Sequence, residues 1–410
     1  MVDVRPFRAL RAPKDLAQRV ASLPYDVMDV DEARAMAGDD PYSFLRVSRP
    51  EIELATGVDA HDDVVYAQGR RNLDAFVAKG VLVRDDTPTY SVYRQRMGDI
   101  EQTGVVGVVA VADYDSGDVR THEHTRPDKE LDRVRHISEL DAQDEPVFLL
   151  SPRSASIEAV VAEVVTTDPV ADFVSVDGVQ HTVWVVDDPA HVTALTAAFA
   201  AVPRLYVADG HHRSAAAARV AAQRRASGAS GEYDTFLAVV FPSDEVAVLA
   251  YNRVVDLAGR SIEDLRASLA EHFVVVQAPN TVEPLQRHVF GMYAAGRWYE
   301  LTLRDGVVEG ADLLAGLDVA VLQDLVLAPL LGVGDPRTEP RLTFVGGIRG
   351  VAELERLVDA DPSKVAFSLH PTSTEELLAV ADAGLVMPPK STWFEPKLRS
   401  GLFVHTLGRE

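Results

Sequence analysis

A run of polar residues, Asp209-Gly210-His211-His212-Arg213, stands between an apolar stretch and an alanine-rich one. The pattern predicts a short buried strand that turns at Gly210 into a helix over 211–226. Free backbone N–H groups and the helix dipole make such a helix start an anion site, and glycine lets the backbone approach a ligand closely. Histidine and arginine donate hydrogen bonds suited to phosphate oxygens. The run therefore predicts a phosphate-binding turn that uses Asp209, Gly210, His211, His212 and Arg213.

Asp209 has two roles open to it, because its carboxylate could orient an imidazole or hold Mg²⁺ through water. The turn is not a Walker motif, since no Gly-Lys-Ser/Thr sequence follows it. The plainer alternative is that Asp209 caps the helix and the two histidines form a solvated first turn. Five consecutive polar or glycine residues directly after an apolar strand favour a binding site instead.

A second polar segment contains His122-Glu123-His124-Thr125. On an extended backbone His122 and His124 share one face and Glu123 takes the other. Glu123 is a candidate general base, held near cationic groups. The two histidines would be metal ligands only if a third ligand joined them, and the pattern lacks the helical spacing of zincins. A solvated charged loop is the alternative for this segment.

The third segment is rich in proline and carries Lys390, Ser391 and Thr392, followed by Trp393 and Phe394. Prolines stiffen the chain, so we expect Lys390 to point at the same cleft as His211 and to reach a phosphate. The two aromatic residues could stack on a base, although aromatic residues in such a place more often belong to the core. Two weaker signals are an acid in a tight turn, Tyr25-Asp26, and Arg253 after a predicted strand.

Composition narrows the class of protein. The chain has 410 residues and a formal net charge of −23, which disfavours binding to nucleic acid and to anionic membranes. It contains no cysteine, which excludes disulfides, thiolate metal sites and cysteine nucleophiles. The start of the chain lacks the layout of a signal peptide, and the apolar runs are too short to span a bilayer. We therefore expect a cytoplasmic protein.

Predicted helices and strands alternate along the chain. Helices are predicted at 30–37, 62–79, 189–201, 211–226, 262–273, 318–331 and 375–383. Strands are predicted at 90–96, 105–111, 146–150, 182–186, 204–208, 236–241, 246–251, 342–345, 365–369 and 402–407. The alternation indicates a mixed α/β fold, classed as α+β. Three regions are predicted: 1–89, 90–260 and 261–410.

Five of these motifs resemble the bacterial and archaeal family called domain-of-unknown-function 1015. They occur in the family's order over most of the chain, and the family is mostly uncharacterised. The matching segments are Arg5-Pro6-Phe7-Arg8, Pro24-Tyr25-Asp26-Val27, His122-Glu123-His124-Thr125, Ala208 to Arg213, and Met387 to Thr392.

A more distant resemblance links the run at 209–213 to free-serine kinases of the ParB/sulfiredoxin-like superfamily. It implies a ParB/sulfiredoxin-like, nucleotide-binding core over 90–260, with N-terminal and C-terminal α/β elaborations. It also implies that a glutamate upstream of the turn, here Glu123, activates the acceptor hydroxyl. Sulfiredoxins carry cysteine where His211 stands, so a chain without cysteine cannot perform their chemistry.

The leading hypothesis is a nucleotide-dependent kinase of a small hydroxyl compound, with free L-serine as the best acceptor and Mg²⁺ as the ion. The donor would be ATP or ADP, and a homodimer is among the oligomeric states left open. Glu123 would take the hydroxyl proton while His211, His212 and Arg213 neutralise the developing phosphoryl charge. The alternatives are a non-catalytic nucleotide sensor and a metal-dependent phosphohydrolase. Substrate contacts are expected from His122, Thr125, Tyr25, Asp26 and Arg253.

Overall fold

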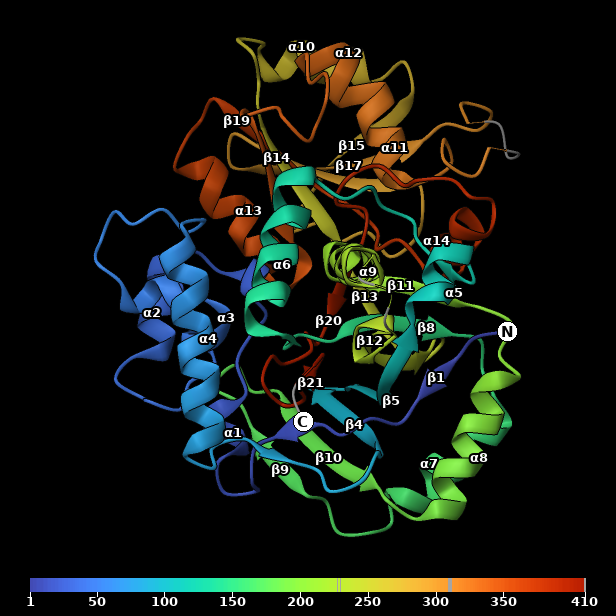
Figure 1. Ribbon diagram of the computed structural model, residues 1–410. Helices are drawn as coiled ribbons and strands as arrows, with labels where there is room; N and C mark the ends of the chain where they lie inside the picture. Colours follow the sequence, from blue (N-terminus) through green and yellow to red (C-terminus); the bar gives the residue numbers. More distant parts are fainter. Residues whose placement is uncertain (227, 229, 309–311, 409–410) are drawn as a thin grey trace. The chain divides into compact units, whose positions relative to one another are not determined.

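The structure is a computed structural model that describes residues 1–226, 228, 230–308 and 312–408. The chain forms two compact units, and each mixes helices with strands (Figure 1). Unit 1 comprises Met1–Val246 and Pro396–Glu410, and unit 2 comprises Ala247–Glu395. The protein therefore has the α+β fold that the alternating pattern predicts. No helix in the described ranges is both long and apolar enough to cross a membrane.

The described part of unit 1 contains a nine-stranded sheet with the order β6-β11-β8-β12-β5-β4-β10-β9, and β1 pairs with β5 off this path. Two short pairs, β2–β3 and β7–β21, lie outside it. The strands of the large sheet are β1 (Val4–Arg5), β4 (Tyr90–Met97), β5 (Ile100–Ala110), β6 (Val119–Arg120), β8 (Val147–Ser151), β9 (Ala171–Val174), β10 (Gln180–Val186), β11 (Leu205–Asp209) and β12 (Thr235–Pro242). The short strands are β2 (Leu10–Arg11), β3 (Val83–Arg84), β7 (Ala142–Gln143) and β21 (His405–Thr406).

Strand β5 is central, as its continuous apolar sequence predicts. It pairs antiparallel with β4 through Val92 and Val105, and antiparallel with β12 on its other side. Residues 104–110 are buried throughout. The chain then enters a short helix at Val111, which the sequence assigns to the strand.

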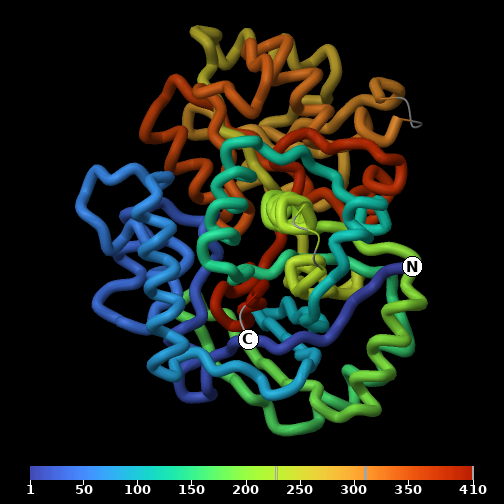
Figure 2. Tube along the Cα trace, viewed as in Figure 1, coloured from blue at the N-terminus to red at the C-terminus, as the bar shows by residue number. Residues whose placement is uncertain are grey.

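Two helices near the start of unit 1 begin with a side-chain cap. Asp29 and Glu32 form a capping box at the start of α2, and Asp62 caps α4. The helical segments are α1 (Ala17–Val20), η1 (Tyr25–Val27), α2 (Val30–Ala37), α3 (Leu45–Ser48), η2 (Pro50–Glu53), α4 (Asp63–Ala78), α5 (Val111–Ser116), α6 (Pro127–Leu140), α7 (Ala155–Val164), α8 (Pro189–Ala200), α9 (His211–Arg225) and η3 (Glu232–Asp234). Helix α6 packs against both α4 and α9, and the three run close together in the Cα trace (Figure 2).

The core of unit 1 lies between its helices and its sheet. Small residues on α9, such as Ala216 and Ala217, are fully buried and join the same apolar cluster as Leu149 and Val207. Because alanine has a short side chain, the helix can approach the strands closely. This packing fixes the first turn of α9 at the end of β11.

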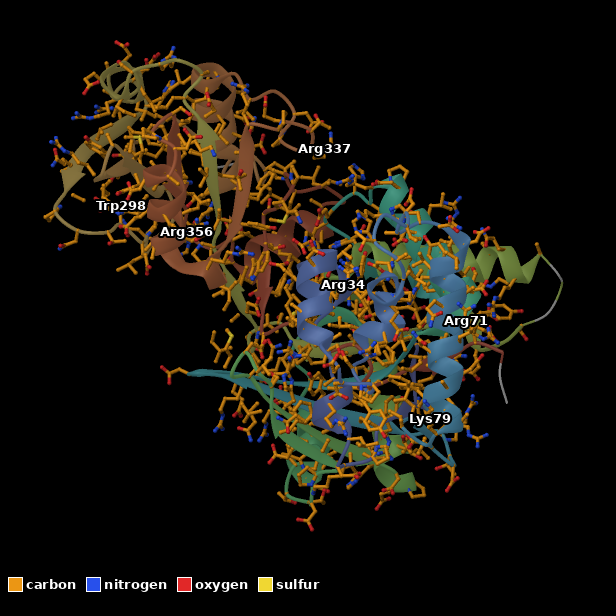
Figure 3. The ribbon with its side chains drawn as sticks, turned by 90° about the vertical axis from the view of Figure 1, so that its left-hand side faces the viewer. Arg34, Arg71, Lys79, Trp298, Arg337 and Arg356 are labelled. Atoms are coloured by element: carbon orange, nitrogen blue, oxygen red, sulfur yellow. The ribbon has the colours of Figure 1, made fainter. Side chains whose placement is uncertain are left out.

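The described part of unit 2 is built on a six-stranded antiparallel sheet with the order β15-β17-β16-β19-β14-β18, and β13 pairs with β20 beside it. Trp298 donates a 2.7 Å hydrogen bond to Glu355 of α13, and Figure 3 labels this tryptophan. The strands are β13 (Ala247–Leu249), β14 (Tyr251–Asp256), β15 (Phe273–Ala278), β16 (Val289–Ala294), β17 (Arg297–Leu303), β18 (Leu342–Gly346), β19 (Lys364–Ser368) and β20 (Trp393–Glu395). The helical segments are α10 (Ile262–Leu269), α11 (Asp318–Leu322), η4 (Gln323–Leu327), α12 (Ala328–Leu331), η5 (Gly347–Arg349), α13 (Gly350–Asp359) and α14 (Thr374–Asp382).

The bounds of the two units differ from those of the three regions predicted from the sequence, which were 1–89, 90–260 and 261–410. The first 89 residues share a unit with the large sheet, because β1 adds to β5 and Phe7 bridges to Thr89. The last residues of the chain also belong to unit 1, since β21 pairs with β7. Long-range strand pairing of this kind leaves no mark in the composition of a segment.

Candidate functional site

The centre of the candidate site is the turn between β11 and α9. The strand is apolar and buried until Asp209, where it ends. Gly210 has a φ of +96°, which favours glycine, and the helix begins at the next residue. A Cβ at this position would lie 2.9 Å from Nε of Arg213. The predicted strand, turn and helix are thus confirmed, and glycine is required by both conformation and space.

The segment that contains Glu123 packs on this first turn. The backbone N–H of Arg126 donates to Nε2 of His212 at 3.0 Å, and the His122 N–H lies 3.5 Å from Nε2 of His211. The rings of His122 and His211 meet edge to face with centroids 4.5 Å apart. Two segments that are 89 residues apart in sequence therefore form one surface.

Burial keeps both of these imidazoles neutral at pH 7. His122 is 2% exposed and His211 is 5% exposed. Burial lowers the pKa of His122 to about 4. Burial, reinforced by His122, holds the pKa of His211 well below its usual range. Unless a ligand raises their pKa values, the two rings act as hydrogen-bonding groups and carry no positive charge.

His122 and His124 do not share an environment, in contrast to the expectation for an extended strand. His124 is exposed while His122 is buried. The loop bends between them to dock on α9, so they cannot act as a pair of metal ligands. In the described ranges, no group of three or more His, Asp or Glu residues could hold a metal ion.

Arg213 points inward beneath the turn. Its guanidinium is 6% exposed, donates to the carbonyl oxygen of Pro146 and lies 3.2 Å from Oδ2 of Asp209. Burial alone would lower the pKa of Arg213, but Asp209 and other acids raise it, so the side chain stays charged. In this arrangement Arg213 holds the turn in place from below.

Lys397 supplies a second cation to the same carboxylate. Its Nζ lies 3.7 Å from Oδ2 of Asp209, and it belongs to the C-terminal part of unit 1. The sequence pattern indicated Lys390 in this run and did not single out Lys397. The available signal was that both are among the chain's few lysines and both follow a proline.

A buried ionic cluster lies next to the turn and includes the predicted Tyr25. The Tyr25 N–H donates to Oε1 of Glu145 at 2.9 Å, and Arg133 stacks on the Tyr25 ring at 3.8 Å. Ser400 also donates to Glu145 at 2.9 Å. Burial and the neighbouring Asp144 raise the pKa of Glu145, although Arg133 and Arg213 oppose the shift. Asp26, the next residue after Tyr25, is exposed.

The sequence pattern did not indicate Arg133 or Glu145 as site residues. Arg133 sits in a stretch that reads as a solvated charged segment, and Glu145 precedes a buried strand without any motif. The signal for Glu145 was its place in Asp144-Glu145-Pro146, an acidic pair directly before an apolar run. Thr125, for which a substrate contact is predicted, donates to Glu130 at 2.8 Å.

The remaining predicted residues gather within unit 2. Arg253 donates to the Lys390 carbonyl oxygen at 2.9 Å and is 4% exposed. Thr372 donates to the Ser391 carbonyl oxygen, and the Ser391 hydroxyl donates to Pro388. Lys390 lies 5.6 Å from the centre of the Tyr251 ring. Arg253, Lys390, Ser391 and the adjoining Thr392 thus lie close together, on the unit that does not carry the turn.

Fold and site together define an α+β protein with a strand–glycine–helix turn packed against an acid-bearing loop. The chain belongs to the family described as protein of unknown function DUF1015, whose model matches residues 4–320. No curated protein matches the chain significantly.

Several solved structures are similar to parts of the chain at low identity. A mutant form of a free serine kinase, in complex with ADP, has 14% identity and a TM-score of 0.35, covering 73% of this chain and 92% of that one. SbnI with a C-terminal truncation from Staphylococcus aureus has 13% identity and a TM-score of 0.37, covering 72% and 87%. A conserved hypothetical protein from Pyrococcus furiosus has 14% identity and a TM-score of 0.35, covering 74% and 95%. The activity of this chain is therefore argued from its own residues.

Proposed function

We propose that this protein is a nucleotide-dependent kinase that phosphorylates the hydroxyl group of a small molecule, with free L-serine as the best single acceptor. The observation that carries the proposal is the docking of the Glu123 loop on the first turn of α9 through His122 and Arg126. A base and an anion-binding helix start then stand beside each other, as phosphoryl transfer requires.

The donor phosphates would bind at the start of α9. The first-turn amides of a helix have no partner within the helix and point towards a ligand. Nε2 of His212 accepts a backbone N–H, which requires the neutral tautomer with its proton on Nδ1. Lys397 would supply the positive charge that the neutral imidazoles lack. ATP and ADP both present the phosphates that such a turn recognises.

Glu123 is the proposed general base. A serine hydroxyl is a poor nucleophile near neutral pH, so a positioned base typically contributes about a hundred- to ten-thousand-fold. Glu123 is half-buried in a loop that packs on the turn, which suits this role. Asp26 is the second candidate, because η1 places it next to Tyr25 and Glu145.

Asp209 fits a protein-bound Mg²⁺ poorly. Its carboxylate lies 3.2 Å from Arg213 and 3.7 Å from Lys397, and two cations at these distances disfavour a third. A carboxylate in this position orients the cations around the turn. Mg²⁺ that arrives with a nucleotide is bound largely by phosphates and water and needs few protein ligands. We therefore assign no step to a metal held by Asp209.

The test is nucleotide consumption by purified protein, with and without L-serine and other hydroxyl compounds. A kinase consumes nucleotide only when an acceptor is present. A phosphohydrolase needs no acceptor, and a sensor consumes none. Either of these two results would overturn the kinase proposal.

Glu123→Gln tests the base within the same assay. The variant keeps the shape of the side chain and should bind nucleotide like the parent while losing transfer by about a hundred- to ten-thousand-fold. Asp26→Asn is the matched comparison, since it removes the other candidate acid. Transfer at the parent rate by Glu123→Gln, together with loss in Asp26→Asn, would reassign the base.

A further inference from the structure

One face of α6 is polar although it is largely buried. Lys129, Asp132, Arg133 and His136 recur at helical spacing and therefore share this face. The last three are 8%, 6% and 2% exposed. Buried charges lower stability unless they are paired or hydrogen-bonded, so the sequence retains an arrangement that is costly for a purely structural helix.

A cavity of about 110 Å³ lies between this face and the segment that carries η2 and the start of α4. Arg49, Glu51, His61 and Tyr66 line it from that side, and Tyr25 closes it near the candidate site. A cavity of roughly 150 Å³ binds benzene, so this smaller space suits one very small molecule. A nucleotide is too large for it.

The two carboxylates of the pocket already have partners. Asp132 accepts from Arg133 at 2.7 Å and from the Tyr66 hydroxyl at 2.7 Å, and it lies 3.1 Å from His61. Glu51 accepts from Arg49 at 2.6 Å. In these pairs, Arg133 and Arg49 offset the negative charges of Asp132 and Glu51.

Two donors are left over. In the described part of the chain no carboxylate pairs with Lys129, which is partly buried. Nη1 of Arg133 is buried without a hydrogen-bond partner among the described residues, and the nearest acid oxygen, on Glu145, is 3.8 Å away. An arginine nitrogen that is buried and unpaired lacks a bond that an anionic oxygen would supply. Apart from its histidines, the lining carries three cationic residues, Arg49, Lys129 and Arg133, against two acidic ones, so it has a surplus of one positive charge.

We propose that this pocket binds the carboxylate of a small zwitterionic molecule of amino-acid size. Lys129 and Arg133 bind the carboxylate, and the ammonium group donates to the remaining acceptor positions of Glu51, which takes one hydrogen bond from Arg49. The inference that this pocket is the acceptor site of the kinase rests on the proposed function. The inference that it binds an amino acid rests on the pocket alone. Tyr25 links the two sites, since its ring stacks on Arg133 and its N–H bonds to Glu145.

Calorimetric titration without nucleotide tests the pocket. The probes are a panel of amino acids that includes L-serine, then ethanolamine, which lacks the carboxylate, and inorganic phosphate. We expect an amino acid to bind and ethanolamine to bind at least about tenfold more weakly, since a charge-assisted hydrogen bond is lost. Equal affinity for L-serine and ethanolamine, or no binding by any amino acid, would overturn the proposal.

Lys129→Met locates the binding site. It removes the charge and keeps the apolar stem, and we expect it to weaken amino-acid binding about tenfold while the melting temperature stays near that of the parent. Lys79→Met is the matched control, because Lys79 is exposed at the end of α4 (Figure 3) and lies outside the pocket lining. Equal loss in both variants would place the ligand elsewhere. Binding of phosphate alone, lost in Lys129→Met, would also contradict the carboxylate assignment.

The experiments distinguish a failure of the kinase proposal from a failure of the pocket proposal. Amino-acid binding without phosphate transfer would overturn the kinase and support the pocket. Transfer to an acceptor with an affinity unchanged by Lys129→Met would support the kinase and overturn the pocket.

Discussion

The two lysines of the C-terminal run have different surroundings. Lys397 lies 3.7 Å from Asp209 at the turn before α9, whereas Lys390 lies near Tyr251 in unit 2. A positive charge at the turn attracts a nucleotide phosphate, and its removal loses a charge-assisted interaction. The structure thus places Lys397 beside the turn, while a contact of Lys390 with phosphate stays a prediction.

We predict that Lys397→Met weakens nucleotide binding by about tenfold, because one ionic hydrogen bond is lost. The matched control is Lys364→Met, whose ammonium pairs with Asp361 on unit 2 at 3.2 Å and lies outside the turn. Calorimetry on both variants measures the effect. Equal affinities of Lys397→Met and the parent would show that Lys397 does not contact the phosphates.

Single residues were predictable where a motif surrounds them. Asp209 and Gly210 stand in a run of five polar or glycine residues, and the structure puts both at the turn. Arg133 and Lys397 were harder to select, because the contacts that join them to the site, with Tyr25 and Asp209, link residues distant in sequence. The residue type of Arg213 suggested a place at the turn, but the direction of its side chain could not be predicted. That direction depends on the packing of α9 against the sheet.

The buried histidines predict a loss of stability in acid. The folded-state pKa of His122 is about 4, below the unfolded value of about 6.5. Between these values the unfolded chain binds more protons, so stability falls as the pH drops from 6.5 towards 4. The slope from one such group is about 1.4 kcal/mol per pH unit. Glu145 acts in the opposite direction, because its pKa is raised in the folded protein.

Urea denaturation between about pH 7.5 and pH 5 measures this slope. His122→Gln should show a shallower dependence on pH than the parent, whatever its stability at neutral pH. His124→Gln is the control, because that side chain is exposed. The same slope in the parent and in His122→Gln would mean that His122 is not held neutral by burial.

At the scale of elements, the glycine turn before α9 combines a positive φ with a close side-chain contact. Gly210 and Gly178 both have positive φ, at +96° and +80°. A Cβ at Gly210 would lie 2.9 Å from Arg213, while one at Gly178 meets no described atom within 4 Å. The two glycines therefore separate the effect of backbone conformation from the effect of close contact.

We predict that Gly178→Ala lowers the free energy of unfolding by about 1 kcal/mol, from backbone strain alone. Gly210→Ala should lower it by more, about 2 to 4 kcal/mol, because Arg213 must also move. It should weaken nucleotide binding as well, whereas Gly178→Ala should not. Equal effects of both changes on stability and binding would show that the contact with Arg213 does not matter.

The sequence predicted elements best where periodicity was strong. The helix patterns at 30–37 and 211–226 match α2 and α9 closely. The strand expected at 246–251 was wrong in extent, because the chain ends β13 at Leu249 and starts β14 at Tyr251. Strands β15, β16 and β17 were missed, since their polar and apolar residues alternate only in part. Hydrogen bonds to neighbouring strands, which local sequence does not encode, decide these cases.

At the scale of the whole chain, the last residues complete unit 1. The chain leaves this unit at Val246 and returns at Pro396. Arg399 is 3% exposed and donates to Nε2 of His181 at 3.1 Å and to Ser175 at 3.2 Å. It also forms an ion pair with Asp177, and His181 in turn contacts the Tyr93 hydroxyl at 2.8 Å. A segment near the chain end thus supplies the central cation of a buried network.

Arg399→Met tests how much unit 1 depends on this return. The variant fills similar space and removes the donors that His181, Ser175 and the partly exposed Asp177 share. We predict a loss of about 2 to 4 kcal/mol in the free energy of unfolding, because buried polar groups left unpaired are costly. Arg356→Met is the matched control on unit 2 (Figure 3), where Arg356 is exposed and its pair with Glu353 should contribute little to stability.

Urea denaturation of both full-length variants, followed by circular dichroism, measures the difference. If the C-terminal segment is part of the core of unit 1, a chain that ends at Glu395 should lose more than Arg399→Met does. That truncation also removes Ser400 from Glu145, Lys397 from Asp209 and β21 from β7. If the truncated chain unfolds at the parent's midpoint, the C-terminal segment is not part of the core of unit 1. The turn before α9 would then form without Lys397.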